Sequence, residues 1–294
     1  MKSAFGYGVV RALSGLLGLL PEPVMRRGGY AFGYLRSFTA RPGMEMAQRH
    51  QRRIQGAEVD ARRAARRVYV FYGRYYAEVF WMRPRRRRAV LAASTVENLD
   101  GLHAAAASPS GAILAVGHLG NWEAAGLTSA SEGAPVLAAA EGLANRRLLD
   151  WFVQMRAMMD IEVAIVRRGA RVTEALTRRL EAGGVVALLF DRDLKASGIP
   201  VTLFGEETTL PAGPLTLACR TGAVVVPVGT YFKPKAGHIF HIHPPLEVPA
   251  EGTLEERVQA GTQCLARVLE EMISRAPEQW HVLQPVWLSD REPR

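Results

Sequence analysis

Residues 112–123 have the sequence AILAVGHLGNWE, in which an apolar run ends at a glycine and a histidine follows at once. The run 112–116 predicts a buried strand, and the residues from Asn121 onward predict a helix. His118 therefore lies where a strand ends, which is where open α/β sheets hold reactive side chains. Glu123 follows five residues later, in the first turn of the predicted helix.

His118 and Glu123 are suited to acid–base chemistry. Histidine accepts protons near neutral pH, and a carboxylate can fix its tautomer and stabilise the imidazolium. The pair resembles a serine-protease triad without its serine, so a substrate hydroxyl would be the nucleophile, as in acyl transfer. In the alternative without catalysis, the helix dipole favours Glu123 and the histidine caps backbone groups. The preceding strand and the flanking glycines favour catalysis.

Strand and helix patterns alternate from about residue 110 onward. Further strands are predicted at residues 135–139, 162–166, 185–190, 223–228 and 238–249. Helices are predicted at residues 121–129, 145–159, 170–182, 212–220 and 254–274. This alternation predicts an α/β fold with a mainly parallel central sheet flanked by helices. The segment between residues 190 and 212, rich in Gly, Pro and Thr, is expected to be a loop.

Residues 1–95 are expected to be helical and to pack on the α/β core of residues 96–294, as one structural domain. Aromatic side chains are so dense over residues 69–81 that they predict either core or the wall of an apolar groove. The apolar run 12–20 is too short to span a bilayer, which takes about 20 residues. It lies on a membrane surface or packs on the domain. The run RPRRRR at 83–88 is a solvated face or a docking site for anionic headgroups.

Composition narrows the classes of partner. The 294 residues carry a net charge of +9, which favours a nucleic acid, an acidic cofactor or an anionic lipid surface. No helix-turn-helix, Walker A or dinucleotide motif supports nucleic-acid binding, nucleotide hydrolysis or NAD chemistry. His238, His241 and His243 lack carboxylates or cysteines at ligand spacing, so no metal is expected. Cys219 and Cys264 are expected to be buried free thiols.

Two further charged groups follow predicted strands. Asp191, Arg192 and Asp193 come directly after the strand at 185–190, on the same sheet edge as the histidine if the strands are parallel. They act in catalysis, or the aspartates cap turns and form ion pairs. Glu141 precedes a helix that carries Arg156, and arginine forms fork-like contacts with phosphate or carboxylate.

The order of the motifs resembles the bacterial lipid A biosynthesis acyltransferase family, and within it the actinobacterial phosphatidylinositol mannoside acyltransferases. The motifs are GHLGNWE (117–123), DRD (191–193), FGE (204–206), PAGP (211–214), TGA (221–223) and VPV (226–228). The resemblance covers most of the chain and is closest over residues 112–230. It implies transfer of a fatty acyl chain from acyl-CoA to a hydroxyl of an anionic glycolipid, a phosphatidylinositol mannoside. The implied enzyme is peripheral, acts at the cytoplasmic face of the cell membrane and uses no cofactor, metal or nucleic acid.

The resemblance also implies residue roles. His118 matches the catalytic base and Glu123 the acid that orients it. The implied substrate-binding residues are Asn121, Glu141, Arg156, Asp191, Arg192 and Asp193. The backbone amides of Gly120 and Asn121 are expected to hold the oxyanion. The acyl groove is expected within residues 1–95.

Three alternatives stay open at this point. In the first, the enzyme is an acyltransferase whose acceptor is a lipid A-like glycolipid or a lysophospholipid. In the second, the protein is an acyl-CoA thioesterase in which the histidine activates water. In the third, it is a membrane-binding protein without catalysis.

Overall fold

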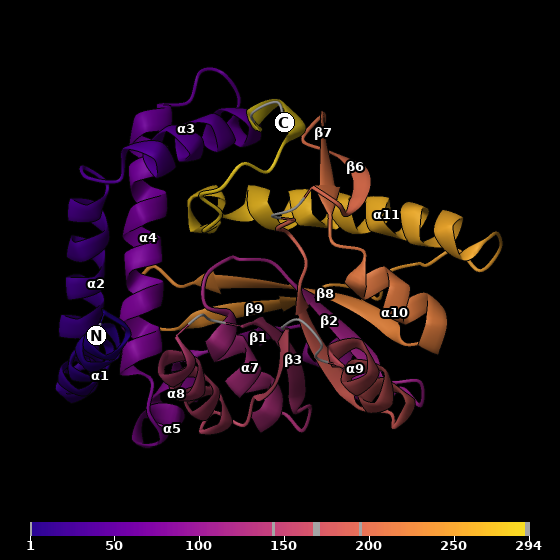
Figure 1. Cartoon of the computed structure of the whole chain (residues 1–294), viewed down its shortest axis with the longest axis horizontal. Coiled ribbons are helices and arrows are strands. Elements are labelled where there is room, and N and C mark those ends of the chain that lie inside the picture. Colours follow the sequence, from indigo (N-terminus) through magenta and orange to yellow (C-terminus); the bar gives the residue numbers. More distant parts are fainter. Residues whose placement is uncertain (1, 143–144, 167–170, 194–195, 292–294) are drawn as a thin grey trace.

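The computed structural model describes residues 2–142, 145–166, 171–193 and 196–291 (Figure 1). Its α-helices are α1 (Lys2–Leu19), α2 (Glu22–Arg36), α3 (Arg41–Gln55), α4 (Ala61–Trp81), α5 (Arg87–Ala93), α6 (Leu99–Ala106), α7 (Trp122–Ser131), α8 (Arg146–Ala157), α9 (Val172–Glu181), α10 (Gly213–Thr221) and α11 (Leu254–Arg275). Its strands are β1 (Thr95–Glu97), β2 (Ala112–Val116), β3 (Val136–Glu141), β4 (Glu162–Val166), β5 (Val185–Leu189), β6 (Ile199–Leu203), β7 (Glu206–Leu210), β8 (Val224–Phe232) and β9 (His238–Ile242). Short 3₁₀ helices are η1 (Pro84–Arg86), η2 (Pro277–Gln279) and η3 (Leu288–Asp290).

The central sheet has the strand order β1-β9-β8-β2-β5-β3-β4, and all pairs are parallel except β8 with β9. Helices cover both faces of the sheet. Apolar side chains of α9, α10 and α11 pack on one face, and those of α5, α6 and α7 pack on the other. The predicted α/β class with a mainly parallel sheet is therefore confirmed. β2 is buried along its whole length because it lies between β5 and β8.

Several predicted boundaries differ from the structure. The strand predicted at 238–249 ends at Ile242, and the predicted loop at 190–212 contains the antiparallel hairpin β6–β7. Pro200 and the nearby Gly198 and Gly205 make β6–β7 resemble a turn region by composition, and only the pairing of the two strands makes it a hairpin. The predicted helix start at residue 170 lies outside the described residues. Cys219 and Cys264 are free thiols, half-buried rather than buried.

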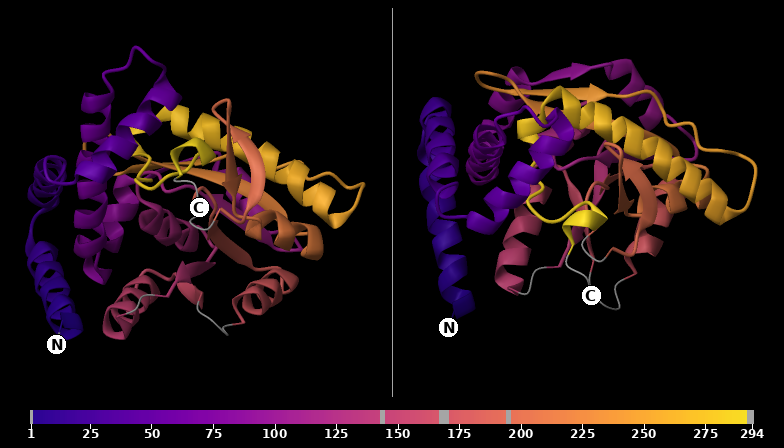
Figure 2. Two further views of the ribbon diagram at one scale, coloured as in Figure 1. Left: turned by 45° about the horizontal axis from the view of Figure 1, so that its top comes forward. Right: turned by 90° about the horizontal axis from the view of Figure 1, so that it is seen from above.

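The N-terminal helices pack together along one side of the α/β core, as both views in Figure 2 show. Glycines bring α2 and α4 into backbone contact. A Cβ on Gly33 would lie 2.0 Å from the carbonyl oxygen of Tyr69, and a Cβ on Gly73 would lie 2.3 Å from that of Gly29. Larger residues at these positions would push the two helices apart. α4 is thereby fixed between the outer helices and the sheet, and its inner side chains reach the site.

Four arginines of the run 83–88 make internal bonds, although Arg85 and Arg88 are exposed. Arg83 donates to the Ser14 hydroxyl, and Arg85 donates to the carbonyl oxygen of Gly18. Arg86 donates to the Leu20 carbonyl oxygen over 3.1 Å, and Arg87 pairs with Asp160. The run ties the end of α1 to the body of the protein, because its guanidinium groups satisfy carbonyls left open at the end of that helix.

Candidate active site

The loop after β2 is shaped by its contacts with β8 and with the C-terminal segment. Gly120 has a φ of +49°, and a Cβ there would lie 2.5 Å from the carbonyl oxygen of Thr230. Only glycine fits both constraints. The Thr230 hydroxyl donates to the carbonyl oxygen of Leu119, and the Gly120 N–H donates to that of Gln279 over 3.1 Å. The loop therefore holds His118 in one place at the end of β2.

Asp191 is the hydrogen-bond partner of His118. The Nδ1 atom of His118 lies 2.6 Å from Oδ1 of Asp191, and the His118 backbone N–H donates to Oδ2 over 2.7 Å. The sheet brings His118 and Asp191 together, because Val116 of β2 is in register with Leu189 of β5. Residues two positions beyond each strand therefore lie side by side at the carboxyl edge. Asp191 is 1% exposed, so this contact is screened little by water.

The charge of Asp191 is stabilised by its neighbours. Burial would raise the pKa of its carboxyl, but His118 and the Trp280 indole N–H, which donates to Oδ2 over 2.8 Å, hold that pKa below its usual value. An ionised carboxylate beside Nδ1 places the ring proton on Nδ1 and leaves Nε2 as the acceptor. His118 therefore has the arrangement of a general base.

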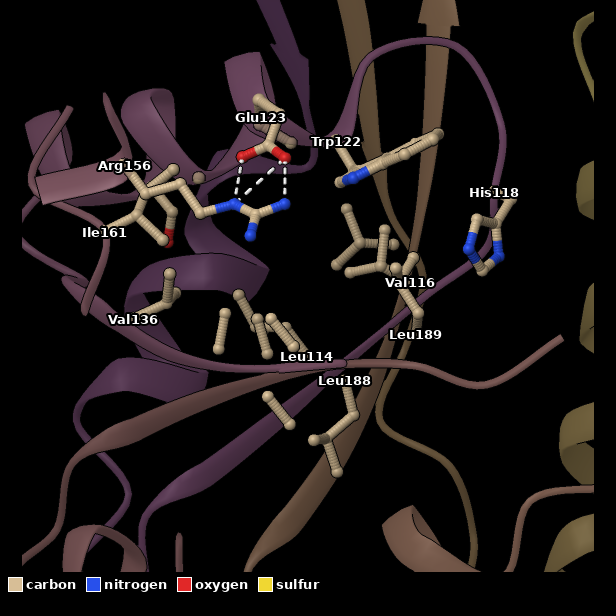
Figure 3. A pocket seen from close by; sticks show the side chains of 18 of the residues that line it. Leu114, Val116, His118, Trp122, Glu123, Val136, Arg156, Ile161, Leu188 and Leu189 are labelled. Carbon is tan, nitrogen blue, oxygen red and sulfur yellow. Dashed lines mark hydrogen bonds and ion pairs between the residues drawn. The ribbon is translucent and has the colours of Figure 1, made fainter. Parts of the chain in front are cut away.

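The hydrogen-bonded pairing of Glu123 with His118 that the prediction implies is not found among the described residues. The Glu123 carboxylate instead accepts hydrogen bonds of 2.6, 3.0 and 3.1 Å from Arg156 of α8. Figure 3 shows Trp122 between Glu123 and His118. The Glu123 carboxylate raises the pKa of Arg156, which secures the charged form of the guanidinium. The site thus contains two separate hydrogen-bonded pairs, His118–Asp191 and Glu123–Arg156.

The other predicted site residues, Arg192, Asp193 and Glu141, lie in different parts of the structure. Arg192 lines the same cavity as His118. Asp193 accepts from the Gly198 N–H and the Thr209 hydroxyl, at 2.7 and 2.8 Å, so it anchors the β6–β7 hairpin. Glu141 is the last residue of β3, and its side chain lies outside what the structure describes.

Asn121, predicted as a substrate-binding residue, makes internal hydrogen bonds at the start of α7. Its side chain is fully buried, accepts from the Ala124 N–H as the cap of α7, and donates to Glu78 over 2.7 Å. The Gly120 amide, predicted to hold the oxyanion, is already used by the carbonyl oxygen of Gln279.

An apolar cavity of about 560 Å³ opens beside His118 (Figure 3). It lies between the sheet and helices α7 and α8, and its polar lining includes His118, Glu123, Arg156 and Arg192. The apolar lining from the sheet and its flanking helices includes Leu114, Val116, Val136, Ala138, Leu149, Phe152, Ile161, Ala187, Leu189 and Phe240. From residues 1–95, where the acyl groove is predicted, the described residues that line this cavity are Tyr72, Tyr75, Tyr76 and Val79 of α4.

A buried network of charged side chains is hydrogen-bonded to Asn121, in the loop that follows His118. Glu78 of α4 accepts from Arg74 over 2.7 Å and lies 2.8 Å from Nε2 of His238, in addition to its bond with Asn121. Burial alone would raise the pKa of Glu78, but His238 and Arg74 lower it to about 2. The pattern that points to this network is a pair of charges four residues apart within an aromatic helix.

Trp280 and His281 are a second group that sequence reasoning missed. Trp280 donates to Asp191, and His281 is hydrogen-bonded to both His118 and Gly120 through backbone oxygens. No local pattern identifies them, because their partners lie far away in the chain.

No group of three His, Cys, Asp or Glu side chains in the described part of the chain is placed to hold a metal ion. His238 pairs with Glu78, and His241 pairs with Glu97 over 2.8 Å.

Comparison with known proteins identifies the class. A family model described as bacterial lipid A biosynthesis acyltransferase matches residues 3–289, and the chain belongs to this family of acyltransferases. It is 36% identical over 222 residues to a phosphatidylinositol mannoside acyltransferase of Mycobacterium tuberculosis, covering 74% of this chain and 68% of the relative. A protein of the same description from Mycolicibacterium smegmatis is 34% identical over 294 residues, covering 98% of this chain and 90% of the relative.

Proposed function

We propose that the protein transfers a fatty acyl chain from acyl-CoA to a mannose hydroxyl of a phosphatidylinositol mannoside. The observation that carries the proposal is a histidine–aspartate pair at an apolar cavity, in a chain whose relatives are described as phosphatidylinositol mannoside acyltransferases. The cavity suits an acyl chain, because burial of each methylene in an apolar site contributes about 0.8 kcal/mol. The thioester is already activated, so the reaction needs no further cofactor.

In this proposal His118 is the general base. With Nδ1–H donated to Asp191, Nε2 takes the proton of the acceptor hydroxyl as that oxygen attacks the thioester carbonyl carbon. A C–O bond forms, and the carbonyl electrons move onto the oxygen. The tetrahedral intermediate then collapses, the C–S bond breaks, and the proton on His118 passes to the departing CoA thiolate. Asp191 stabilises the imidazolium between the two steps.

The pair Glu123–Arg156 serves the same site through charge. Glu123 holds the guanidinium in place with hydrogen bonds to Nε and Nη2, while Arg156 lines the cavity. We propose that Arg156 stabilises negative charge on the substrates, with Glu123 as its positioning residue. The N-terminus of α7, which begins at Trp122, supplies a partial positive charge for the oxyanion.

A membrane-facing side is part of the proposal. Exposed apolar side chains gather on α1 and α2, namely Leu13, Leu16, Leu19, Val24, Phe32 and Leu35. Among the described residues, no helix has the length and apolarity needed to cross a bilayer. An exposed apolar face on a chain of net charge +9 fits docking on the cytoplasmic surface of an anionic membrane.

CoA release from palmitoyl-CoA tests the activity, measured with and without phosphatidylinositol mannoside, for the wild type and for His118→Ala. We expect acceptor-dependent release that is lost in the variant. Release independent of acceptor would indicate a thioesterase. If a lipid A precursor or a lysophospholipid stimulates release instead, that lipid is the acceptor rather than phosphatidylinositol mannoside. Activity that survives His118→Ala would refute the mechanism.

A further inference from the structure

The segment 279–282, close to the C-terminus, lies against the loop that carries His118. The backbone N–H of His281 donates to the carbonyl oxygen of His118 over 2.8 Å. The ring Nε2 of His281 lies 3.1 Å from the carbonyl oxygen of Gly120. Leu119 and Trp280 form an isolated antiparallel bridge. The segment therefore acts as a short extra strand along the loop, more than 150 residues away in sequence.

Trp280 makes the contact that reaches furthest into the site. Its ring is 1% exposed, and its indole N–H donates to Oδ2 of Asp191. The same Oδ2 accepts the backbone N–H of His118, which leaves Oδ1 for the imidazole Nδ1. The carboxylate is held at both oxygens, so it cannot rotate without breaking a bond to a buried charge.

We propose that Trp280 is a positioning residue of the reaction, which fixes the Asp191 carboxylate so that His118 presents Nε2 to the acceptor hydroxyl. The proposal rests on the proposed function of the site. Trp280 touches neither reacting atom and acts only through Asp191.

Among the residues that the structure describes, two titratable side chains have an interaction with the Asp191 carboxylate that bears on its charge. They are His118, from the loop after β2, and His281, from the C-terminal segment. Burial lowers the pKa of His281 to about 3, so it stays neutral near pH 7. Loss of the indole donor would remove one of the hydrogen bonds that stabilise the ionised Asp191 carboxylate, so the pKa of that carboxyl would rise.

Trp280→Phe tests the proposal, because it keeps a buried aromatic ring and removes the N–H. Trp287→Phe is the matched control. Trp287 is also fully buried and also loses one indole hydrogen bond, 2.8 Å to the carbonyl oxygen of Leu203, but that bond lies away from Asp191. We expect Trp280→Phe to lower kcat about tenfold relative to the control, with KM for acyl-CoA little changed. The acid limb of the pH profile should also move to higher pH. Equal kcat values and equal pH profiles in the two variants would overturn the proposal.

A proton NMR measurement separates this inference from the activity itself. The Nδ1 proton of His118 gives a downfield signal when it is held by a carboxylate, whatever substrate the enzyme uses. We expect faster exchange of this proton with water in Trp280→Phe and an unchanged signal in Trp287→Phe. A wild type that lacks acyltransferase activity but gives this result would refute the proposed function alone. Identical exchange in both variants would refute the role of Trp280 alone.

Discussion

Replacing Asp191 with asparagine removes the negative charge beside His118 while keeping the size of the side chain. The Nδ1–Oδ1 distance of 2.6 Å puts the centres of the ring and carboxylate charges roughly 4 Å apart. At an effective dielectric constant of about 20, that interaction amounts to about 4 kcal/mol. Asparagine forfeits it when the imidazolium forms, so kcat should fall about 10³-fold, since each 1.36 kcal/mol corresponds to about a factor of ten.

The assay is steady-state CoA release with saturating acceptor, for Asp191→Asn and for Asp193→Asn. Asp193 belongs to the same motif, but its carboxylate bonds to Gly198 and Thr209 rather than to His118. We expect Asp193→Asn to change kcat less than about fivefold, as for a substitution away from the reacting atoms. The reasoning would be refuted if Asp191→Asn kept kcat within a few-fold of wild type. That outcome, with a large loss in Glu123→Gln, would return the orienting role to Glu123.

Three further predictions concern other parts of the structure. The pKa of Glu78 lies near 2 in the fold against 4.5 as a reference, so its stabilisation is complete above pH 4.5 and is lost as pH falls towards 2. The free energy of unfolding should fall by about 3 kcal/mol over this pH range. Urea unfolding at several acidic pH values should show this decrease, and Glu78→Gln should remove it. Ala138→Leu narrows the cavity and should shift preference from palmitoyl-CoA to decanoyl-CoA; an unchanged ratio of kcat/KM would place the acyl chain elsewhere. Leu16→Glu, at a position 61% exposed on α1, should weaken sedimentation with anionic lipid vesicles. Ala57→Glu, at an exposed position on the α3–α4 loop, adds the same charge and is the control; equal binding of the two variants would argue against docking through α1.

The strand–loop–helix frame of the site could be predicted from sequence because its signals are local. The apolar run 112–116, the glycines after it and the start of a helix near Asn121 fall where the structure has β2, the His118 loop and α7. The same reasoning missed β1, which has only three residues. It also missed the β6–β7 hairpin, whose proline and nearby glycines are typical of turns. β1 exists through its pairing with β9, which lies far along the chain, whereas β6 and β7 pair with each other within residues 199–210.

The partner of His118 shows where sequence reasoning stopped. Glu123 was the nearer carboxylate in sequence and Asp191 the nearer one in space. The pairing of Glu123 with Arg156 requires α8 to lie beside α7, which no spacing within either helix specifies. The supporting contact from Trp280 spans 89 residues.

The amino-acid sequence by itself determined the fold class, the strand edge that carries His118 and the charged residues that gather there, because hydrophobic periodicity and turn residues act over a few neighbours. Only the tertiary structure decided which carboxylate serves the histidine. The parallel register of β2 with β5 brings Asp191 beside Nδ1, whereas the packing of α8 draws Glu123 to Arg156. Such pairings depend on long-range packing, where a hydrogen bond between buried charges forms only once the strands and helices that carry them have met.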